Sequence, residues 1–142
     1  MLVGQSCRAV DIPVVSISIT YELVRRITDL AGFPKILVHP TCSTAHLGLS
    51  ETLLEIAGVL TASADIPLGT TCCGTAGDRG LLHPELVHSA TRDTLVQIQS
   101  SEDDTCFVSA NRTCELGMRQ TTGKVYESFI YLLEELSRPQ AG

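Results

Sequence analysis

The apolar residues of this chain fall into two alternating patterns. Short apolar runs, such as Ile36-Leu37-Val38, stand between longer segments in which apolar residues recur every three or four positions. The short runs predict buried strands, and the longer segments predict amphipathic helices. We expect strands over residues 36–38, 64–68, 105–110 and 124–126, and helices over 21–30, 50–60, 83–98, 111–122 and 128–136.

Strands that alternate with helices along a chain favour a parallel sheet with crossover helices. The predicted fold class is therefore α/β: a small three-layer domain whose three- to four-stranded, mostly parallel sheet has helices on both faces. Two of the expected helices show their inner side clearly. It consists of Leu53, Leu54, Ile56, Ala57 and Leu60 in the helix over 50–60, and of Leu86, Ala90, Leu95 and Ile98 in the helix over 83–98.

Local signals mark the ends of the later helices. Pro84 suits a first helical turn, because its missing N–H would have no partner there. Asn111 is a good N-cap, and Gly123 is typical of a residue that ends a helix.

Composition fits one globular domain and excludes several classes of protein. A length of 142 residues with 44% hydrophobic content is enough for a core. The net charge of −6 argues against a nucleic-acid-binding protein. No apolar run approaches the roughly 20 residues of a membrane-spanning helix, and the first residues lack a signal-peptide pattern. We expect a ragged segment over 1–15, one domain over 16–138, and a cytoplasmic location.

In a reducing cytoplasm, the six cysteines are better explained as metal ligands or core thiols than as disulfides. Cys72 and Cys73 are adjacent in a glycine-rich bend, where two thiols can face one ligand. Cys42 directly follows the first expected strand, and Cys114 lies in the first turn of the helix after the third. Because the carboxyl ends of parallel strands share one edge, we expect these four thiols to converge as metal ligands.

Other residues in these segments are candidates for contact with the bound group. Gly74 and Gly77 permit a positive φ, and their N–H groups are suited to donate hydrogen bonds to sulfur. Arg79 either pairs with Asp78 or lies near the bound group, and Arg112 is placed to offset its negative charge.

The remaining cysteine and histidine residues have more ordinary interpretations. Cys106 stands between apolar residues of a strand and is interpreted as a core thiol. His39 and His83 each precede a proline at the end of an element; both are candidate ligands, but a structural role is the favoured interpretation. His46 and His88 are interpreted as surface residues.

Three motifs carry the candidate cysteines: HPTCST at 39–44, CCGTAGDRG at 72–80 and NRTCELGM at 111–118. Together they resemble the cysteine-rich CCG domain of heterodisulfide-reductase-type iron–sulfur proteins. More narrowly, they are similar to the second such domain, at the C-terminal end of flavin- and iron–sulfur-containing D-lactate dehydrogenases, and to the iron–sulfur subunit of glycolate oxidase. Asn111 stands where the broad family pattern has a fifth cysteine. Four thiolates remain, which by count suffice for one 4Fe–4S cluster. Two adjacent cysteines do not easily reach two corners of one cluster, so it stays open whether both Cys72 and Cys73 are direct ligands.

The resemblance implies an electron-transfer role. The chain would be the iron–sulfur domain, as a C-terminal fragment or small subunit, of an FAD-dependent D-lactate or 2-hydroxy-acid dehydrogenase. FAD would sit on a flavoprotein domain or subunit, and a quinone or cytochrome would accept the electrons. Such a domain is not catalytically complete alone, and it can act at the inner face of a membrane. Two alternatives stay open: a zinc-binding or metal-free docking domain, and a thiol redox enzyme that uses Cys73 or Cys114.

Overall fold

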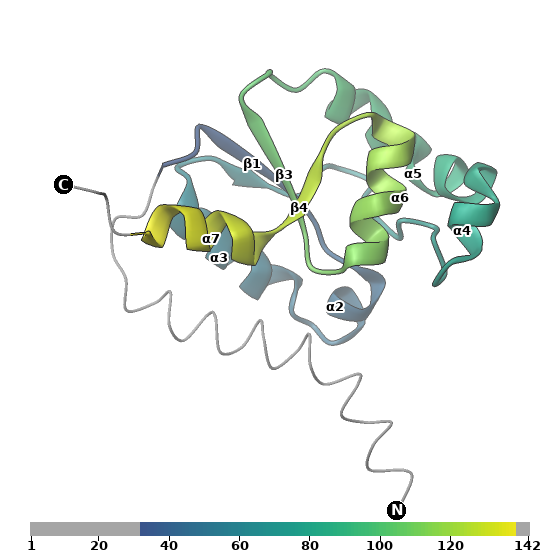
Figure 1. Cartoon of the computed structure of the whole chain (residues 1–142), viewed down its shortest axis with the longest axis horizontal. Coiled ribbons are helices and arrows are strands. Elements are labelled where there is room, and N and C mark those ends of the chain that lie inside the picture. The colour runs from purple at the N-terminus through teal and green to yellow at the C-terminus, as the bar shows by residue number, and fades with distance from the viewer. Residues whose placement is uncertain (1–31, 139–142) are drawn as a thin grey trace, which may run out of the picture.

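The computed structural model describes residues 32–138, in which four strands form one sheet and six helices surround it (Figure 1). All strand pairs are parallel, and the strand order is β2-β1-β3-β4. The predicted α/β fold is therefore confirmed. The strands are β1 (Lys35–His39), β2 (Ala64–Asp65), β3 (Thr105–Ser109) and β4 (Tyr126–Ser128). The helices are α2 (Cys42–His46), α3 (Ser50–Leu60), α4 (Arg79–Leu82), α5 (Pro84–Gln99), α6 (Arg112–Thr122) and α7 (Phe129–Ser137).

The order of the strands creates a crevice between the first and the third. After β1 the chain crosses to β2 on one side, and it then returns to form β3 on the other side of β1. The connections that leave β1 and β3 therefore diverge from neighbouring strand ends. In open parallel sheets such a divergence leaves a space outside the carboxyl ends of the two strands.

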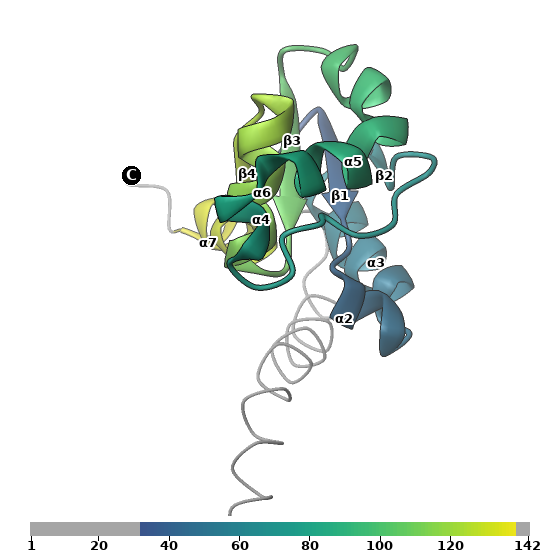
Figure 2. The same ribbon diagram turned by 90° about the vertical axis from the view of Figure 1, so that its right-hand side faces the viewer.

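Each face of the sheet is covered by a pair of helices, as the three-layer prediction required. Side chains alternate between faces along a strand, so Ile36 and Val38 pack against α3 and α7, whereas Leu37 packs against α5 and α6. In β3 the same rule places Val108 with the first group and Phe107 with the second. Helices α4, α5 and α6 lie nearest the viewer in Figure 2.

The inner face of α5 differs from the prediction. Leu86 is 40% exposed, and the buried positions are Val87, Thr91, Thr94 and Ile98. Ile98 is buried as predicted, but at the other three predicted positions, Leu86, Ala90 and Leu95, the buried residue is the immediate neighbour. Threonine is tolerated there because its hydroxyl is satisfied within the helix: Thr91 Oγ1 donates to the Val87 carbonyl at 2.8 Å, and Thr94 Oγ1 to the Thr91 carbonyl at 2.9 Å.

Most other element predictions are confirmed, with shifts at the ends. The inner face of α3 is as expected, except that Leu54 is only partly buried. The strand expected over 64–68 is limited to Ala64–Asp65, the edge strand lies at Tyr126–Ser128, and neither α2 nor α4 was predicted. Asn111 caps α6, and Gly123 ends it with a φ of 73°. The segment 1–15 and the helix over 21–30 lie outside the described residues, so the division of the chain stays a prediction.

Candidate metal centre

The end of β1 places a histidine and a cysteine close together. His39 is the last residue of β1, and it lies on the same face as Leu37, toward α5 and α6. The chain then turns into α2, where Thr41 is the N-cap and its Oγ1 accepts a hydrogen bond from the Thr44 N–H at 3.1 Å. Cys42 is the first residue of this short helix and is exposed.

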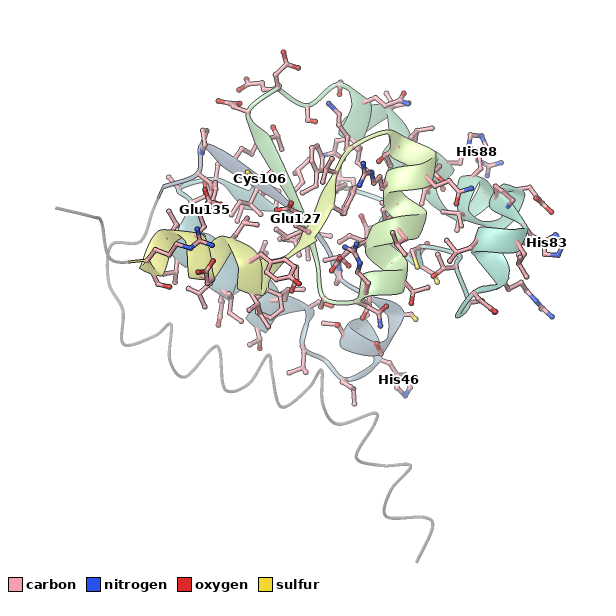
Figure 3. The ribbon with its side chains drawn as sticks, in the orientation of Figure 1. His46, His83, His88, Cys106, Glu127 and Glu135 are labelled. Atoms are coloured by element: carbon pink, nitrogen blue, oxygen red, sulfur yellow. The ribbon has the colours of Figure 1, made fainter. Side chains whose placement is uncertain are left out.

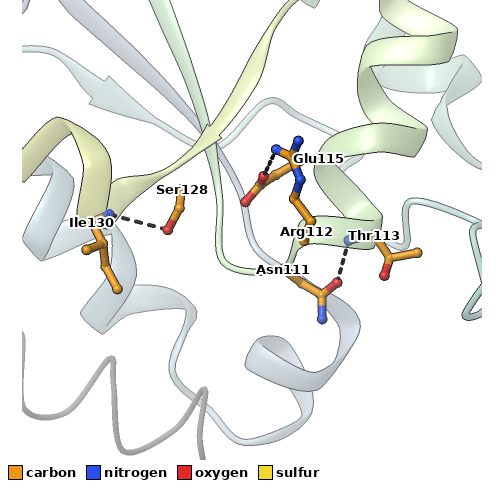
Figure 4. A network of polar contacts seen from close by, with 6 residues as sticks. All are labelled: Asn111, Arg112, Thr113, Glu115, Ser128 and Ile130. Atoms are coloured by element: carbon orange, nitrogen blue, oxygen red, sulfur yellow. Dashed lines mark hydrogen bonds and ion pairs between the residues drawn. The ribbon is translucent and has the colours of Figure 1, made fainter.

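The end of β3 is arranged in a similar way and is tied to β1. Ser109 Oγ donates to the carbonyl oxygen of His39 at 3.0 Å, which joins the last residues of the two strands. Asn111 then caps α6 by accepting a hydrogen bond from the Thr113 N–H at 2.9 Å (Figure 4). Cys114 is therefore held in the first turn of α6, where it is buried.

The loop that carries the cysteine doublet is closed by tight packing. Gly74 has a φ of 77°, and a side chain there would meet the Leu86 carbonyl oxygen at 2.7 Å and the Ala90 Cβ at 2.9 Å. Glycine is thus required at this position because the loop lies directly against α5. The Gly74 N–H donates to Cys72 Sγ at 3.3 Å, as expected for a loop whose backbone interacts with sulfur.

The four predicted ligands line one cavity of about 160 Å³ at the carboxyl edge of the sheet. Cys42 is exposed, Cys72 is partly buried, and Cys73 and Cys114 are buried, so the thiols extend from the surface into the interior. The cavity is lined by Thr41, Cys42, Ser43, Cys72, Cys73, Thr75, Ala76, Gly77, Asn111, Thr113 and Cys114. The expected convergence of segments far apart in sequence is therefore present.

The adjacent cysteines have different partners. Cys73 Sγ lies 2.9 Å from Cys114 Sγ and 2.9 Å from Thr75 Oγ1, inside the cavity. The hydrogen bond from Cys114 lowers the pKa of the Cys73 thiol well below its usual range, and the same contact raises the pKa of Cys114. Nearer the rim, burial raises the pKa of Cys72, and the neighbouring thiols of Cys73 and Cys42 add to that shift. The two cysteines of the doublet thus lie at different depths, and Cys73 is the one that contacts Cys114.

His39 is a histidine for which the sequence pattern favoured a structural role over ligation. Its side chain is 4% exposed, and a ring nitrogen lies with Cys73 Sγ and Cys114 Sγ in a group whose atoms are all within 4.8 Å of one another. Its Nε2 atom is buried and has no hydrogen-bond partner. The sequence feature that could have identified His39 as a site residue is its place at the end of a strand, three residues before Cys42.

The predicted accessory residues lie at different distances from this centre. Gly77 lines the cavity, whereas Arg79 is exposed in α4 and forms no ion pair with Asp78, so the pairing interpretation was wrong. Arg112 Nη1 donates to the buried carboxylate of Glu115 at 2.9 Å (Figure 4). Contacts from Arg79 and Arg112 to a bound group stay predictions.

The remaining histidines and Cys106 lie away from the cavity. His46, His83 and His88 are exposed, as Figure 3 shows, and His83 Nδ1 lies 3.2 Å from Glu85 Oε1. Cys106 is partly buried and packs on the opposite face, with the residues between the sheet and α3 and α7. The surface interpretation of His46 and His88 is confirmed, and Cys106 is a partly buried thiol at the edge of the core.

The donor set fits a metal centre. Thiolates and a neutral imidazole are the ligands that zinc and iron–sulfur clusters take from proteins. Here four thiols line one cavity, and an imidazole with an unpartnered nitrogen lies against two of them.

No helix in residues 32–138 has the length and hydrophobicity to cross a bilayer.

Comparison with known proteins gives one match. A family model described as the cysteine-rich domain CCG matches residues 36–119, which is more than half of the chain. The matched segment runs from β1 into α6 and includes all four cysteines of the cavity. The search of curated proteins and the search of solved structures found no match.

Proposed function

The chain belongs to the cysteine-rich CCG domain family, and from this premise we propose that it is an iron–sulfur electron-transfer domain. The observation that supports this proposal is the gathering of Cys42, Cys72, Cys73 and Cys114 around one cavity. In the proposed centre these thiolates are ligands of one cluster, which by ligand count is of the 4Fe–4S type. When bound, such a cluster accepts and releases single electrons.

The residues around the thiols have definable roles in this proposal. The Thr75 hydroxyl, 2.9 Å from Cys73 Sγ, and the Gly74 N–H, 3.3 Å from Cys72 Sγ, are placed to stabilise negative charge on ligating sulfur. Burial of Cys73 and Cys114 keeps water from the inner ligands. Cys42 is exposed at the rim of the cavity, so electrons would have a short path from the cluster to a partner protein. Arg112 and Arg79 would contribute positive charge on the outer side.

We further propose that the domain serves a D-lactate or 2-hydroxy-acid dehydrogenase, as a C-terminal fragment or small subunit. This part of the proposal rests on the similarity of the motifs at 39–44, 72–80 and 111–118. The flavin on a partner domain or subunit would take two electrons from the hydroxy acid. This chain would pass them on singly toward a quinone or cytochrome, at the cytoplasmic side of the membrane.

A zinc-binding or metal-free docking domain is the second candidate. One observation favours zinc: His39, Cys73 and Cys114 offer donor atoms within 4.8 Å of one another. Two ligands at 2.0–2.3 Å from one ion in tetrahedral geometry are separated by roughly 3–4 Å. Small side-chain rotations would therefore let a single ion bind to this group.

The test is anaerobic reconstitution of the full chain with ferrous iron and sulfide. A cluster gives iron and acid-labile sulfide in equal amounts and a broad visible absorbance that dithionite bleaches. Cys114→Ser should lose most of the iron. Cys106→Ser, on the opposite face of the sheet, is the matched control and should retain it. One equivalent of zinc with no iron or sulfide, or equal iron in both variants, would overturn the proposal.

A further inference from the structure

We propose that His39 is itself a ligand of this centre and donates a ring nitrogen to one of its irons beside Cys73 and Cys114. The inference deepens the proposed function and rests on it. It changes the ligand set from thiolates alone to a mixture of nitrogen and sulfur. Cys42, Cys72, Cys73 and Cys114 then offer more thiols than the remaining ligand positions of a four-iron cluster require.

The first argument is the state of the imidazole. His39 is 4% exposed, and Nε2 has no hydrogen-bond partner. A buried polar atom without a partner is destabilising, so such atoms are rare unless another group completes them. A metal ion at this position would satisfy Nε2 through its lone pair.

The second argument is the position of the ring. A ring nitrogen and the two inner Sγ atoms form the one group of three closely spaced metal-binding side chains within residues 32–138. The backbone of His39 and its ring are each held by one contact. Ser109 Oγ holds the backbone of His39 through its carbonyl, and Tyr126 packs edge-on against the imidazole with ring centroids 6.5 Å apart. The position of the imidazole is therefore defined before a cluster binds, and the Cys73 and Cys114 side chains would rotate to bring their sulfurs onto other irons.

A competing role for His39 is a hydrogen bond to sulfur. An imidazole N–H close to Cys73 Sγ lowers the pKa of that thiol. In that role His39 would be a positioning residue and would not touch iron. The two roles differ in the strength of the magnetic coupling between the imidazole nitrogen and the cluster, because only a direct ligand shares spin density through a bond.

Nitrogen ligation also predicts a direction for the redox chemistry. A neutral imidazole in place of a thiolate makes the centre less negative, and reduction of the centre becomes easier. Replacement of cysteine by histidine raises the potential of Rieske clusters in this way. His39→Cys should therefore keep the cluster and lower its midpoint potential.

The experiment uses the full chain, labelled with histidine that carries ¹⁵N in the ring only. After reconstitution, pulsed EPR is recorded on whichever redox state is paramagnetic. The chain has four histidines, and the other three, His46, His83 and His88, are exposed. We expect strong nitrogen modulation that changes with the label and disappears in His39→Cys. His88→Cys is the control and should leave the spectrum and the potential unchanged.

The outcomes separate the two proposals. If the cluster forms but its spectrum is insensitive to the label, or shows only the weak coupling of a hydrogen-bonded nitrogen, His39 is not a ligand and the cluster assignment stands. If wild-type protein binds no cluster, the proposed function fails and this inference fails with it. The labelling result is obtained on wild-type protein, so it decides the question even if His39→Cys does not fold.

Discussion

The Sγ atoms of Cys73 and Cys114 lie 2.9 Å apart, although 41 positions separate the two residues in the chain. Cys73 arrives on the loop between β2 and α4, and Cys114 on the first turn of α6. Both segments reach the same place because the carboxyl ends of parallel strands share one edge of the sheet. This contact links the chemistry of the site to the strand order.

The first prediction is a disulfide between Cys73 and Cys114 in metal-free protein. A disulfide needs sulfurs at about 2.05 Å, so the two sulfurs have to approach by a further ~1 Å or less. Treatment with diamide, which takes up the two electrons and two protons, should link these residues, and peptide mapping by mass spectrometry will identify the bond. Metal-loaded protein should be protected. A dominant Cys42–Cys72 bond would contradict the prediction.

The second prediction concerns alkylation of the metal-free protein by iodoacetamide. Cys42 is exposed and should react first, whereas Cys73 is 2% exposed and should react slower by on the order of tenfold or more, despite its lowered pKa. Metal loading should slow the alkylation of Cys42 and leave the alkylation rate of Cys106 unchanged. Fast modification of Cys73 or Cys114 would instead support the thiol redox enzyme.

The third prediction separates backbone strain from packing in the glycine-rich loop. Gly74→Ala should destabilise the fold by about 2–4 kcal/mol, because its positive φ and the contacts with Leu86 and Ala90 both oppose a side chain. Gly77→Ala is the matched control, since its φ is 76° but its surroundings are open, and should cost about 1–2 kcal/mol. Urea unfolding of both variants measures the difference. Equal losses would show that packing against α5 is unimportant.

The fourth prediction concerns Arg112 and its buried partner. Arg112→Ala leaves the carboxylate of Glu115, which is 3% exposed, without its ion pair, and should cost about 1–2 kcal/mol. Arg138 pairs with the exposed Glu134, so Arg138→Ala should cause no measurable change in urea unfolding.

If Arg112 also offsets cluster charge, its loss should lower the midpoint potential of the reconstituted protein. An unchanged potential would restrict Arg112 to a structural role.

Much of the fold could be predicted because its signals are local. The N-cap at Asn111 and the glycine that ends α6 each depend on a few neighbouring residues. The inner face of α5 could not be read in the same way. Two inward threonines look polar in sequence, and only the helical geometry shows that their hydroxyls bond to Val87 and Thr91 carbonyls.

The sequence by itself determined the α/β alternation and the four thiols that gather at one sheet edge. Both follow from periodicity and from the rule that parallel strands end at a common edge. Only the tertiary structure decided that Cys73, and not Cys72, contacts Cys114, and that His39 lies beside these two thiols. Those neighbours depend on which strand lies next to β1 and on which face His39 occupies, and both are set by long-range packing.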